Sequence, residues 1–224
     1  MFPMLWVLPM LFAPAAALEA PRRMQAQFAA QAPRLEGRLT EWQQATPIAF
    51  SGRPLAGHPR HATVYALWDA ANLYLAFDVY SSPLQAQVRE HDGDRLWFDD
   101  GIEFLIDAHR DRGTAYLPDD FAYHINIRNT VFDDRGTPQG QPDKAWNGVA
   151  RHSVHILSDH RYLVEVAVPW AEIGLTPVAG TTRLGIDLCV NGSDPATGAY
   201  DYFDWCHLQV FHDPSGFGEM ELVG

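Results

Sequence analysis

The chain has 224 residues, of which 47% are hydrophobic and 20% are charged, so it can form one large folded domain with a sizeable core rather than a disordered chain. Its 28 Asp and Glu outnumber its 16 Lys and Arg, which gives a formal net charge of −12. This balance argues against a nucleic-acid partner and against binding to an anionic membrane surface. It is compatible with a neutral ligand or a bound cation, although most of the charge serves solubility.

The N-terminal segment has the pattern of a signal peptide. Residues 2–12 are apolar and are followed by Ala-Pro-Ala-Ala-Ala ending at Ala17, although no Lys or Arg precedes the run. We expect cleavage after Ala17 and a secreted or periplasmic protein; translation from Met24 is the alternative. The apolar run is too short to cross a bilayer, so we expect no membrane insertion of the mature chain. Residues 18–33, rich in Ala and Gln, predict a linker or a short helix.

The segment from residue 34 onward predicts a domain built of short strands. Apolar and polar residues alternate with a period of two, as in strands with one buried face. The predicted strands are residues 62–68, 72–80, 102–107, 121–128, 149–157, 162–168, 184–190 and 219–223. The Asp-Ala-Ala-Asn step ending at Asn72 predicts a hairpin, and Pro169 predicts a helical turn over residues 170–175. This pattern indicates an all-β fold, an antiparallel β-sandwich or jelly roll, over residues 34–224.

The stretch Trp-Phe-Asp-Asp-Gly-Ile-Glu-Phe-Leu-Ile-Asp, residues 97–107, is the most informative. Its alternation directs Glu103 away from the apolar face, and the same alternation directs polar residues of the predicted strands 121–128 and 184–190 away from theirs. An aromatic ring beside a carboxylate suits a sugar ring, whereas a plain structural strand is the simpler interpretation. If the three strands are neighbours, they form a polar platform beside Trp97. The predicted core positions opposite this platform are Ile102, Phe104, Ile106, Ile125, Ile127, Ile186 and Leu188.

Five motifs in order give the chain a family resemblance. They are Leu-Glu-Gly-Arg-Leu-Thr-Glu-Trp at residues 35–42, the hairpin with its Leu-Trp-Asp turn at 64–79, residues 97–107, the segment ending Val-Pro-Trp at 162–170, and Asp-Pro-Ser-Gly-Phe-Gly at 213–218. Over residues 35–223 the chain resembles the family 9 carbohydrate-binding modules and the wider DOMON-like sandwich group. The resemblance implies a non-catalytic domain that binds a mono-, oligo- or polysaccharide, often accompanies glycosidases and serves polysaccharide breakdown.

The resemblance also implies which residues bind the sugar. Two aromatic rings sandwich the terminal sugar in this family, and they fall on Trp97 and on Phe211, where the family usually has Trp. The carboxylate that binds sugar hydroxyls falls on Glu103, a family Arg on His124 and a family Gln on Cys189. These departures put affinity and sugar choice in question, because Phe stacks less surface than Trp and Cys is a weak donor. Alternation adds Asn126 and Asn191 to the expected site.

A structural calcium ion and a disulfide are two further expectations. Calcium is common in these modules, and the hard oxygen ligands would come from the loop after the diagnostic strand, although no EF-hand spacing is present. The alternative is a solvated acidic loop. The two cysteines of an exported chain permit one bridge, and two free thiols are the alternative. The residues concerned are Asp107, Asp111, Asp119 and Asp120 for calcium, and Cys189 and Cys206 for the disulfide.

Two other classes of protein are compatible with the sequence. A small glycoside hydrolase would use two carboxylates, such as Glu103 and Asp187. A haem or redox DOMON-type domain would use His and Met ligands. The chain has 10 His, but only Met24 and Met220 lie beyond the expected signal peptide.

Overall fold

The computed structural model describes residues 22–194 and 196–224, so the predicted signal peptide lies outside the described residues. Short 3-10 helices occur at Leu39–Trp42 (η1), Leu96–Phe98 (η2) and Pro214–Gly216 (η3), and the described segments contain no α-helix. The strands are β1 (Arg23–Phe28), β2 (Ile48–Leu55), β3 (His58–Trp68), β4 (Asn72–Tyr80), β5 (Gly101–Asp107), β6 (Asp120–Asn126), β7 (Val131–Gly136), β8 (Pro142–Asp143), β9 (Arg151–Ser158), β10 (Arg161–Pro169), β11 (Arg183–Ser193), β12 (Tyr200–Asp204) and β13 (Gly218–Val223).

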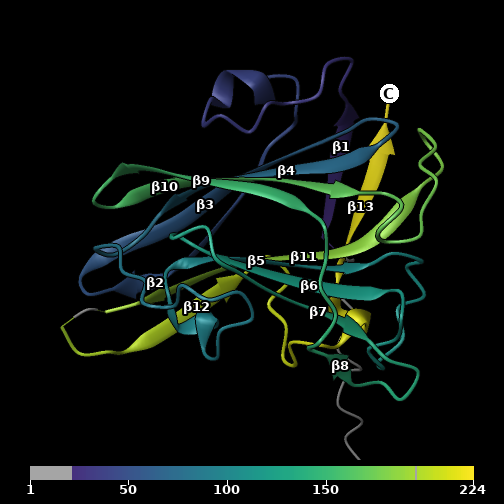
Figure 1. Cartoon of the computed structure of the whole chain (residues 1–224). Helices are drawn as coiled ribbons and strands as arrows, with labels where there is room; N and C mark the ends of the chain where they lie inside the picture. Colours follow the sequence, from purple (N-terminus) through teal and green to yellow (C-terminus); the bar gives the residue numbers. More distant parts are fainter. Residues whose placement is uncertain (1–21, 195) are drawn as a thin grey trace, which may run out of the picture.

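The strands form one 13-stranded sheet that curls into two packed layers (Figure 1). One layer runs β8-β7-β6-β5-β11, with β12 on the far side of β11, and the other contains β2, β3, β4, β10 and β9. β13 and β1 connect them. Every pairing is antiparallel except those of β1, which is parallel to both β13 and β3. The predicted all-β antiparallel sandwich is therefore confirmed, with β1 as its one parallel element among the described strands.

The prediction of a linker or short helix over residues 18–33 is wrong where the structure describes them. Residues Arg23–Phe28 form β1, and Met24 and Ala26 point into the core. The sequence signal was weak because this strand is short and rich in Ala and Gln. Its stability comes from pairing on both sides, with the last strand of the fold and with β3, and such long-range pairing is not visible in a local pattern.

All eight predicted strands are present, whereas β1, β2, β7, β8 and β12 were not predicted. β7 contains Asp133, Asp134 and Arg135, which mask any apolar alternation. It is held by its antiparallel pairing with β6. Residues 170–175 form a hydrogen-bonded turn instead of a helix, in which the Leu175 N–H donates to the Trp170 carbonyl. The predicted hairpin between β3 and β4 is confirmed.

The core lies between the two layers. Six of the seven predicted core side chains are buried there, and Ile127, which follows the end of β6, is partly buried against the core. Phe104 stacks on Tyr123 with ring centroids 4.7 Å apart. The Tyr162 hydroxyl donates to the Gly101 carbonyl at 2.9 Å and so joins the two layers at the start of β5.

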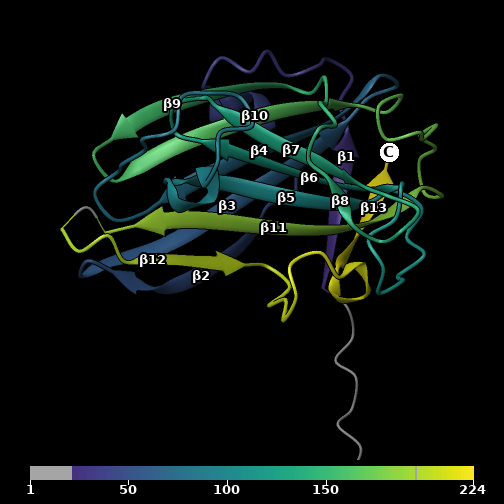
Figure 2. The same ribbon diagram turned by 60° about the horizontal axis from the view of Figure 1, so that its bottom comes forward.

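Loops cover parts of both outer faces. Residues 29–45, drawn in purple to blue above β4 in Figure 1, place Trp42 and Leu35 on the outer face of β4 and β10. Near the C-terminus, Leu208, Phe211 and Phe217 pack on the outer face of β5 and β6 around Leu105. Figure 2 turns this second outer face toward the viewer. The loop that carries Leu208 and Phe211 covers only part of the outer face of β5 and β6, and the rest of that face is open as a pocket.

Candidate functional site

The site is built on a row of side chains that crosses four neighbouring strands. The register sets Cys189 of β11 opposite Glu103 of β5, Glu103 opposite His124 of β6, and His124 opposite Phe132 of β7. All four point away from the core, because their neighbours along each strand fill it. The expected polar platform therefore exists, since β11, β5 and β6 are adjacent in the sheet.

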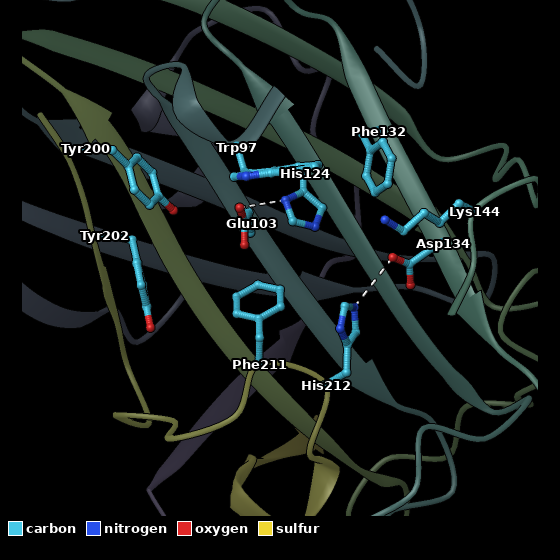
Figure 3. A pocket seen from close by; sticks show the side chains of 10 residues that line it. All are labelled: Trp97, Glu103, His124, Phe132, Asp134, Lys144, Tyr200, Tyr202, Phe211 and His212. Atoms are coloured by element: carbon cyan, nitrogen blue, oxygen red, sulfur yellow. Dashed lines mark ion pairs between the residues drawn. The ribbon is translucent and has the colours of Figure 1, made fainter. Parts of the chain in front are cut away.

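A pocket of about 320 Å³ opens above this row. Figure 3 shows the side chains around it. They come from η2, from strands β5, β6, β7 and β12, from the residue after β8 and from the loop before η3. The ten lining residues are Trp97, Glu103, His124, Phe132, Asp134, Lys144, Tyr200, Tyr202, Phe211 and His212.

Aromatic rings form most of the pocket wall. Trp97 and Phe211 lie on opposite sides of the Glu103 carboxylate (Figure 3). Trp97 meets Phe132 edge to face, with centroids 5.8 Å apart. Tyr200 and Tyr202 project from the same face of β12 and form a third side, their rings 6.1 Å apart. The predicted pair of aromatic walls thus shares one pocket.

Two aspartates that follow Trp97 fix the loop that presents it. The Asp99 carboxylate accepts hydrogen bonds from the backbone N–H groups of Gln87 and Val88 at 2.8 and 2.9 Å. Asp100 accepts from the Gln85 N–H at 2.9 Å and from the Ser81 hydroxyl at 3.0 Å. Burial raises the pKa of Asp100 to about 7 against these hydrogen bonds. Both carboxylates therefore serve to position η2 instead of facing a ligand.

Asn126 does not lie in the pocket, so its predicted role as a ligand contact is corrected. Its amide group donates to the Val88 carbonyl and to Asp99, both at 2.9 Å. Its side-chain carbonyl accepts from the N–H groups of Arg128 and Thr130, both at 3.0 Å. Alternation placed Asn126 on the correct face of β6, but the neighbouring loops use all of its hydrogen-bonding groups.

Glu103 is the buried carboxylate of the pocket floor, with its side chain 3% exposed. Its Oε1 forms an ion pair with His124 Nδ1 at 2.5 Å and accepts a hydrogen bond from the Asn191 side-chain amide. Its Oε2 has no hydrogen-bond partner among residues 22–194 and 196–224, and one Glu103 oxygen points toward Phe211 in Figure 3. One oxygen of a rigidly held carboxylate is thus free to accept a hydrogen bond from a ligand.

His124 has a raised pKa. Burial alone would lower the pKa of this imidazole, but the charge and hydrogen bond of Glu103, aided by Asp134 and Asp133, raise it above 6.5. The raised pKa shifts the equilibrium toward the imidazolium, in which both ring nitrogens are donors. Asn191 donates to Glu103, and its oxygen accepts from the Tyr200 hydroxyl at 2.9 Å. Asn191 thus orients two pocket residues from behind without lining the pocket.

The two cysteines are free, so the predicted disulfide is wrong. Cys189 lies opposite Asp204, whereas the Cys206 N–H donates to the Asp187 carboxylate, two residues along β11. The cysteines are therefore diagonal neighbours, which lie roughly 7–8 Å apart in a sheet and are too far apart to bridge. Cys189 is also fully buried and does not line the pocket, so its predicted contact with a sugar is not supported.

The four aspartates predicted to bind calcium surround the ends of β5 and β6. Asp107 accepts from the Arg112 N–H at 3.1 Å, Asp111 from the Gly113 N–H at 2.8 Å, and Asp119 pairs with His109 at 3.2 Å. Asp120 retains one buried oxygen without a partner. Across the described ranges, no group of three or more His, Cys, Asp or Glu side chains is arranged to hold a metal ion. This arrangement does not fit calcium as it stands, and calcium stays a prediction.

The two alternative classes find no support in the geometry. Asp187 is fully buried, accepts a hydrogen bond from the Cys206 N–H at 2.9 Å and does not line the pocket, so it cannot act there with Glu103. Met24 and Met220 face each other in the pairing of β1 with β13 and pack in the core. The thioethers that a His–Met site would need are thus directed away from the pocket.

Comparison with known proteins identifies the family. The family model for the carbohydrate family 9 binding domain-like proteins matches residues 37–224. The chain belongs to this family. The resemblance predicted from the five motifs is therefore confirmed, and residues 37–224 form a binding module of this family. No helix in the part of the chain that the structure describes has the length and apolarity needed to cross a membrane.

Two curated relatives and two solved structures illustrate the similarity. The chain is 30% identical over 196 residues to endo-1,4-beta-xylanase A of Thermoanaerobacterium saccharolyticum and 28% identical over 196 residues to exoglucanase XynX of Acetivibrio thermocellus. Each alignment covers 86% of the chain but only 15% and 16% of these relatives. The chain thus spans about one sixth of their length.

The solved structures are a family 9 carbohydrate binding module from Caldicellulosiruptor kristjanssonii in complex with cellotriose and the same type of module in complex with glucose. The alignment with the first has a TM-score of 0.71 and 21% identity, and it covers 91% of this chain and 94% of that module. The second has a TM-score of 0.70, 21% identity and coverages of 91% and 96%. At this identity the match shows that the fold is shared.

Six pocket residues were missed from the sequence. Tyr200 and Tyr202 follow the two-residue period of a strand, but the turn-rich composition of residues 193–198 obscured it. Phe132, Asp134 and His212 reach the pocket only through the pairing of β7 and the course of the loop after β12. The sequence offered one signal that could have drawn attention to Lys144, which is that it is the single lysine of the chain.

Proposed function

We propose that the chain binds a saccharide in the pocket above Glu103, with the sugar ring between Trp97 and Phe211. The single observation that carries this proposal is one aromatic-walled pocket with a free carboxylate oxygen at its floor. Aromatic faces supply apolar contact to the C–H groups of a pyranose, and the polar floor accepts its hydroxyl hydrogens. The relatives support it, since two are named a xylanase and an exoglucanase and two solved modules hold cellotriose and glucose.

The same relatives support a role in polysaccharide breakdown. The matched segment is a small part of each, so the domain supplies binding while catalysis belongs to other parts of those proteins.

We also propose that the chain is exported with cleavage after Ala17. Mass spectrometry of the secreted or periplasmic protein should find Leu18 at its N-terminus, and a soluble cytoplasmic product that retains Met1 would contradict export.

Truncation of the central ring tests the proposal. Trp97→Ala removes one wall of the slot and should weaken binding of glucose or cellotriose at least roughly 30-fold, since loss of a central aromatic anchor costs about 2 kcal/mol or more. Isothermal titration calorimetry measures the affinity. Phe28→Ala is the matched control, because Phe28 is an aromatic residue 45% exposed on β1 and does not line the pocket.

The control should bind like the wild type, and both variants should retain the β-sheet circular-dichroism spectrum. Phe211→Trp should tighten binding, because the larger indole ring restores stacking area. Equal affinity of Trp97→Ala and the wild type would place the ligand elsewhere, and the pocket would then lose its proposed role.

A further inference from the structure

The only lysine of the chain, Lys144, lies at the pocket. It follows β8, and its amine lies 5.9 Å from the centroid of the Trp97 ring and 5.8 Å from that of Phe132. Figure 3 shows the amine turned toward His124 and the interior of the pocket. It forms no ion pair with any carboxylate among the described residues, although the chain carries a net charge of −12.

The two carboxylates of the pocket are already paired. Glu103 pairs with His124, and Asp134 pairs with His212 at 3.5 Å. Their side chains are only 3% and 1% exposed, whereas Lys144 is exposed. A ligand therefore meets the lysine amine directly, while the two carboxylates lie beneath it, each beside an imidazole.

The nitrogen groups gather on one side of the pocket. Lys144, His124 and His212 face the pocket from the side opposite Tyr200 and Tyr202 (Figure 3). The second ring nitrogen of His124, Nε2, has no partner in the described chain. The pocket is thus asymmetric, with phenol rings on one side and two imidazoles and the lysine ammonium on the other.

We propose that the pocket prefers an acidic sugar, a hexuronic acid, and that Lys144 with His124 Nε2 binds its carboxylate. This inference rests on the proposed function, because it places the same sugar ring between the same aromatic walls. With the ring between Trp97 and Phe211, a carboxylate at its edge can reach the lysine side while hydroxyls reach Glu103. An ammonium group forms a charge-assisted hydrogen bond with a carboxylate but only an ordinary one with a sugar hydroxyl.

The experiment compares three ligands of similar shape by isothermal titration calorimetry at low salt. D-glucuronate carries the carboxylate, D-glucuronamide is its neutral isostere and D-glucose is the parent sugar. The wild type should bind glucuronate about tenfold more tightly than either neutral ligand, the difference expected for one hydrogen bond to a charged group. Added salt should reduce this preference, because it screens the exposed amine.

Lys144→Met removes the charge but keeps the length of the side chain. It should abolish the preference for glucuronate, because it weakens glucuronate binding more than glucose binding, and Lys144→Arg should retain the preference. Arg38→Gln is the matched control: Arg38 is 62% exposed beside η1, over the opposite outer face, and its loss should change neither affinity.

A second readout uses the uniqueness of the lysine. A limiting amount of an amine-acylating reagent modifies only Lys144 and the N-terminus, and mass spectrometry separates the two. Saturating glucuronate should protect Lys144 at least about threefold relative to the N-terminus, whereas glucuronamide should protect it less.

The outcomes separate this inference from the proposed function. Equal binding of glucose and glucuronate by the wild type, or an equal loss of both in Lys144→Met, would overturn the inference and leave saccharide binding in place. Binding of none of the three ligands would overturn the inference together with the function on which it rests.

Discussion

Two buried glutamates on opposite outer faces differ in what they hold. Glu165 of β10 accepts from the Trp42 indole N–H at 2.8 Å and from the Gly37 N–H at 2.6 Å, so it fixes the loop over β4 and β10. Glu103 of β5 uses one oxygen for His124 and Asn191 and leaves the other to the pocket. The same residue type therefore has a structural role on one face and a binding role on the other.

This difference predicts the effect of removing one charge at a time. Glu103→Gln should weaken saccharide binding about tenfold, because an amide is a poorer acceptor than a carboxylate for sugar hydroxyls. It should also lower the pKa of His124, because that imidazole loses the charge that raises its pKa. Calorimetry measures the first effect, and NMR titration of the imidazole measures the second.

Glu165→Gln is the control for this substitution. It should leave affinity unchanged while lowering the free energy of unfolding by about 1–3 kcal/mol, since two buried N–H donors lose a charged acceptor. If Glu103→Gln reduced stability but not affinity, Glu103 would be a structural residue like Glu165.

Among the elements, β1 decides whether the sheet is continuous. It lies between β13 and β3, and without it the last strand and the β3 layer would both expose edges. Its contribution to the core comes from Met24, which is 4% exposed, and from Ala26, which is fully buried. The short strand thus supplies both the pairing and part of the packing that join the two layers.

We predict that the core side chain of β1 contributes to global stability. Met24→Ala should lower the free energy of unfolding by about 2–4 kcal/mol, because it removes buried apolar area and leaves a cavity. Chemical denaturation measures this value. Gln25→Ala on the same strand is the control, since Gln25 is exposed and should change stability by less than about 0.5 kcal/mol. Equal effects would mean that β1 is not anchored as described.

The whole molecule contains several buried aspartates whose pKa values are raised. The pKa values of Asp100, Asp120 and Asp187 rise to about 7 and that of Asp133 to about 6, in each case chiefly because burial disfavours the carboxylate. The charges of Asp107, Asp119 and Asp111 add to the shift at Asp120. Ionisation of these buried carboxylates lowers the free energy of unfolding, so the stability of the protein depends on pH.

The sign of this dependence follows from proton binding. The ordinary pKa of these groups is 3.8, so between pH 3.8 and about 7 the folded state holds protons that the unfolded state has released. Their stabilising contribution is therefore complete below 3.8 and is lost as the pH rises through about 7. We predict that the melting temperature increases as the pH is lowered from about 8 to about 5.5.

Differential scanning calorimetry across this pH range tests the prediction. Asp120→Asn should flatten the profile, because it removes one buried titrating group. Running the series with calcium and with a chelator also tests the calcium prediction, since a bound cation would compensate the same carboxylates and raise the melting temperature at pH 8. A melting temperature that falls from pH 8 to 5.5 would contradict the assignment of raised pKa values.

The sequence by itself determined eight of the described strands and their inner and outer faces. The alternation in β5, β6 and β11 has a period of two, and a strand turns successive side chains to opposite sides whatever it is paired with. It therefore separated Ile102 and Phe104 from Glu103, and the ordered motifs identified the family. Trp97, Glu103, His124 and Phe211 were all predicted from the sequence, and all four line the pocket.

Only the tertiary structure decided which outward residues meet in the site. Asn126 and Glu103 share the outer face of the same layer, but loops 81–100 and 127–130 use Asn126 for their own backbone hydrogen bonds. Strand register set the two cysteines diagonally, and the loops after β8 and β12 brought Lys144 and His212 to the pocket. The physical reason is that pairing register and loop course depend on contacts far apart in the sequence, which a local two-residue period does not encode.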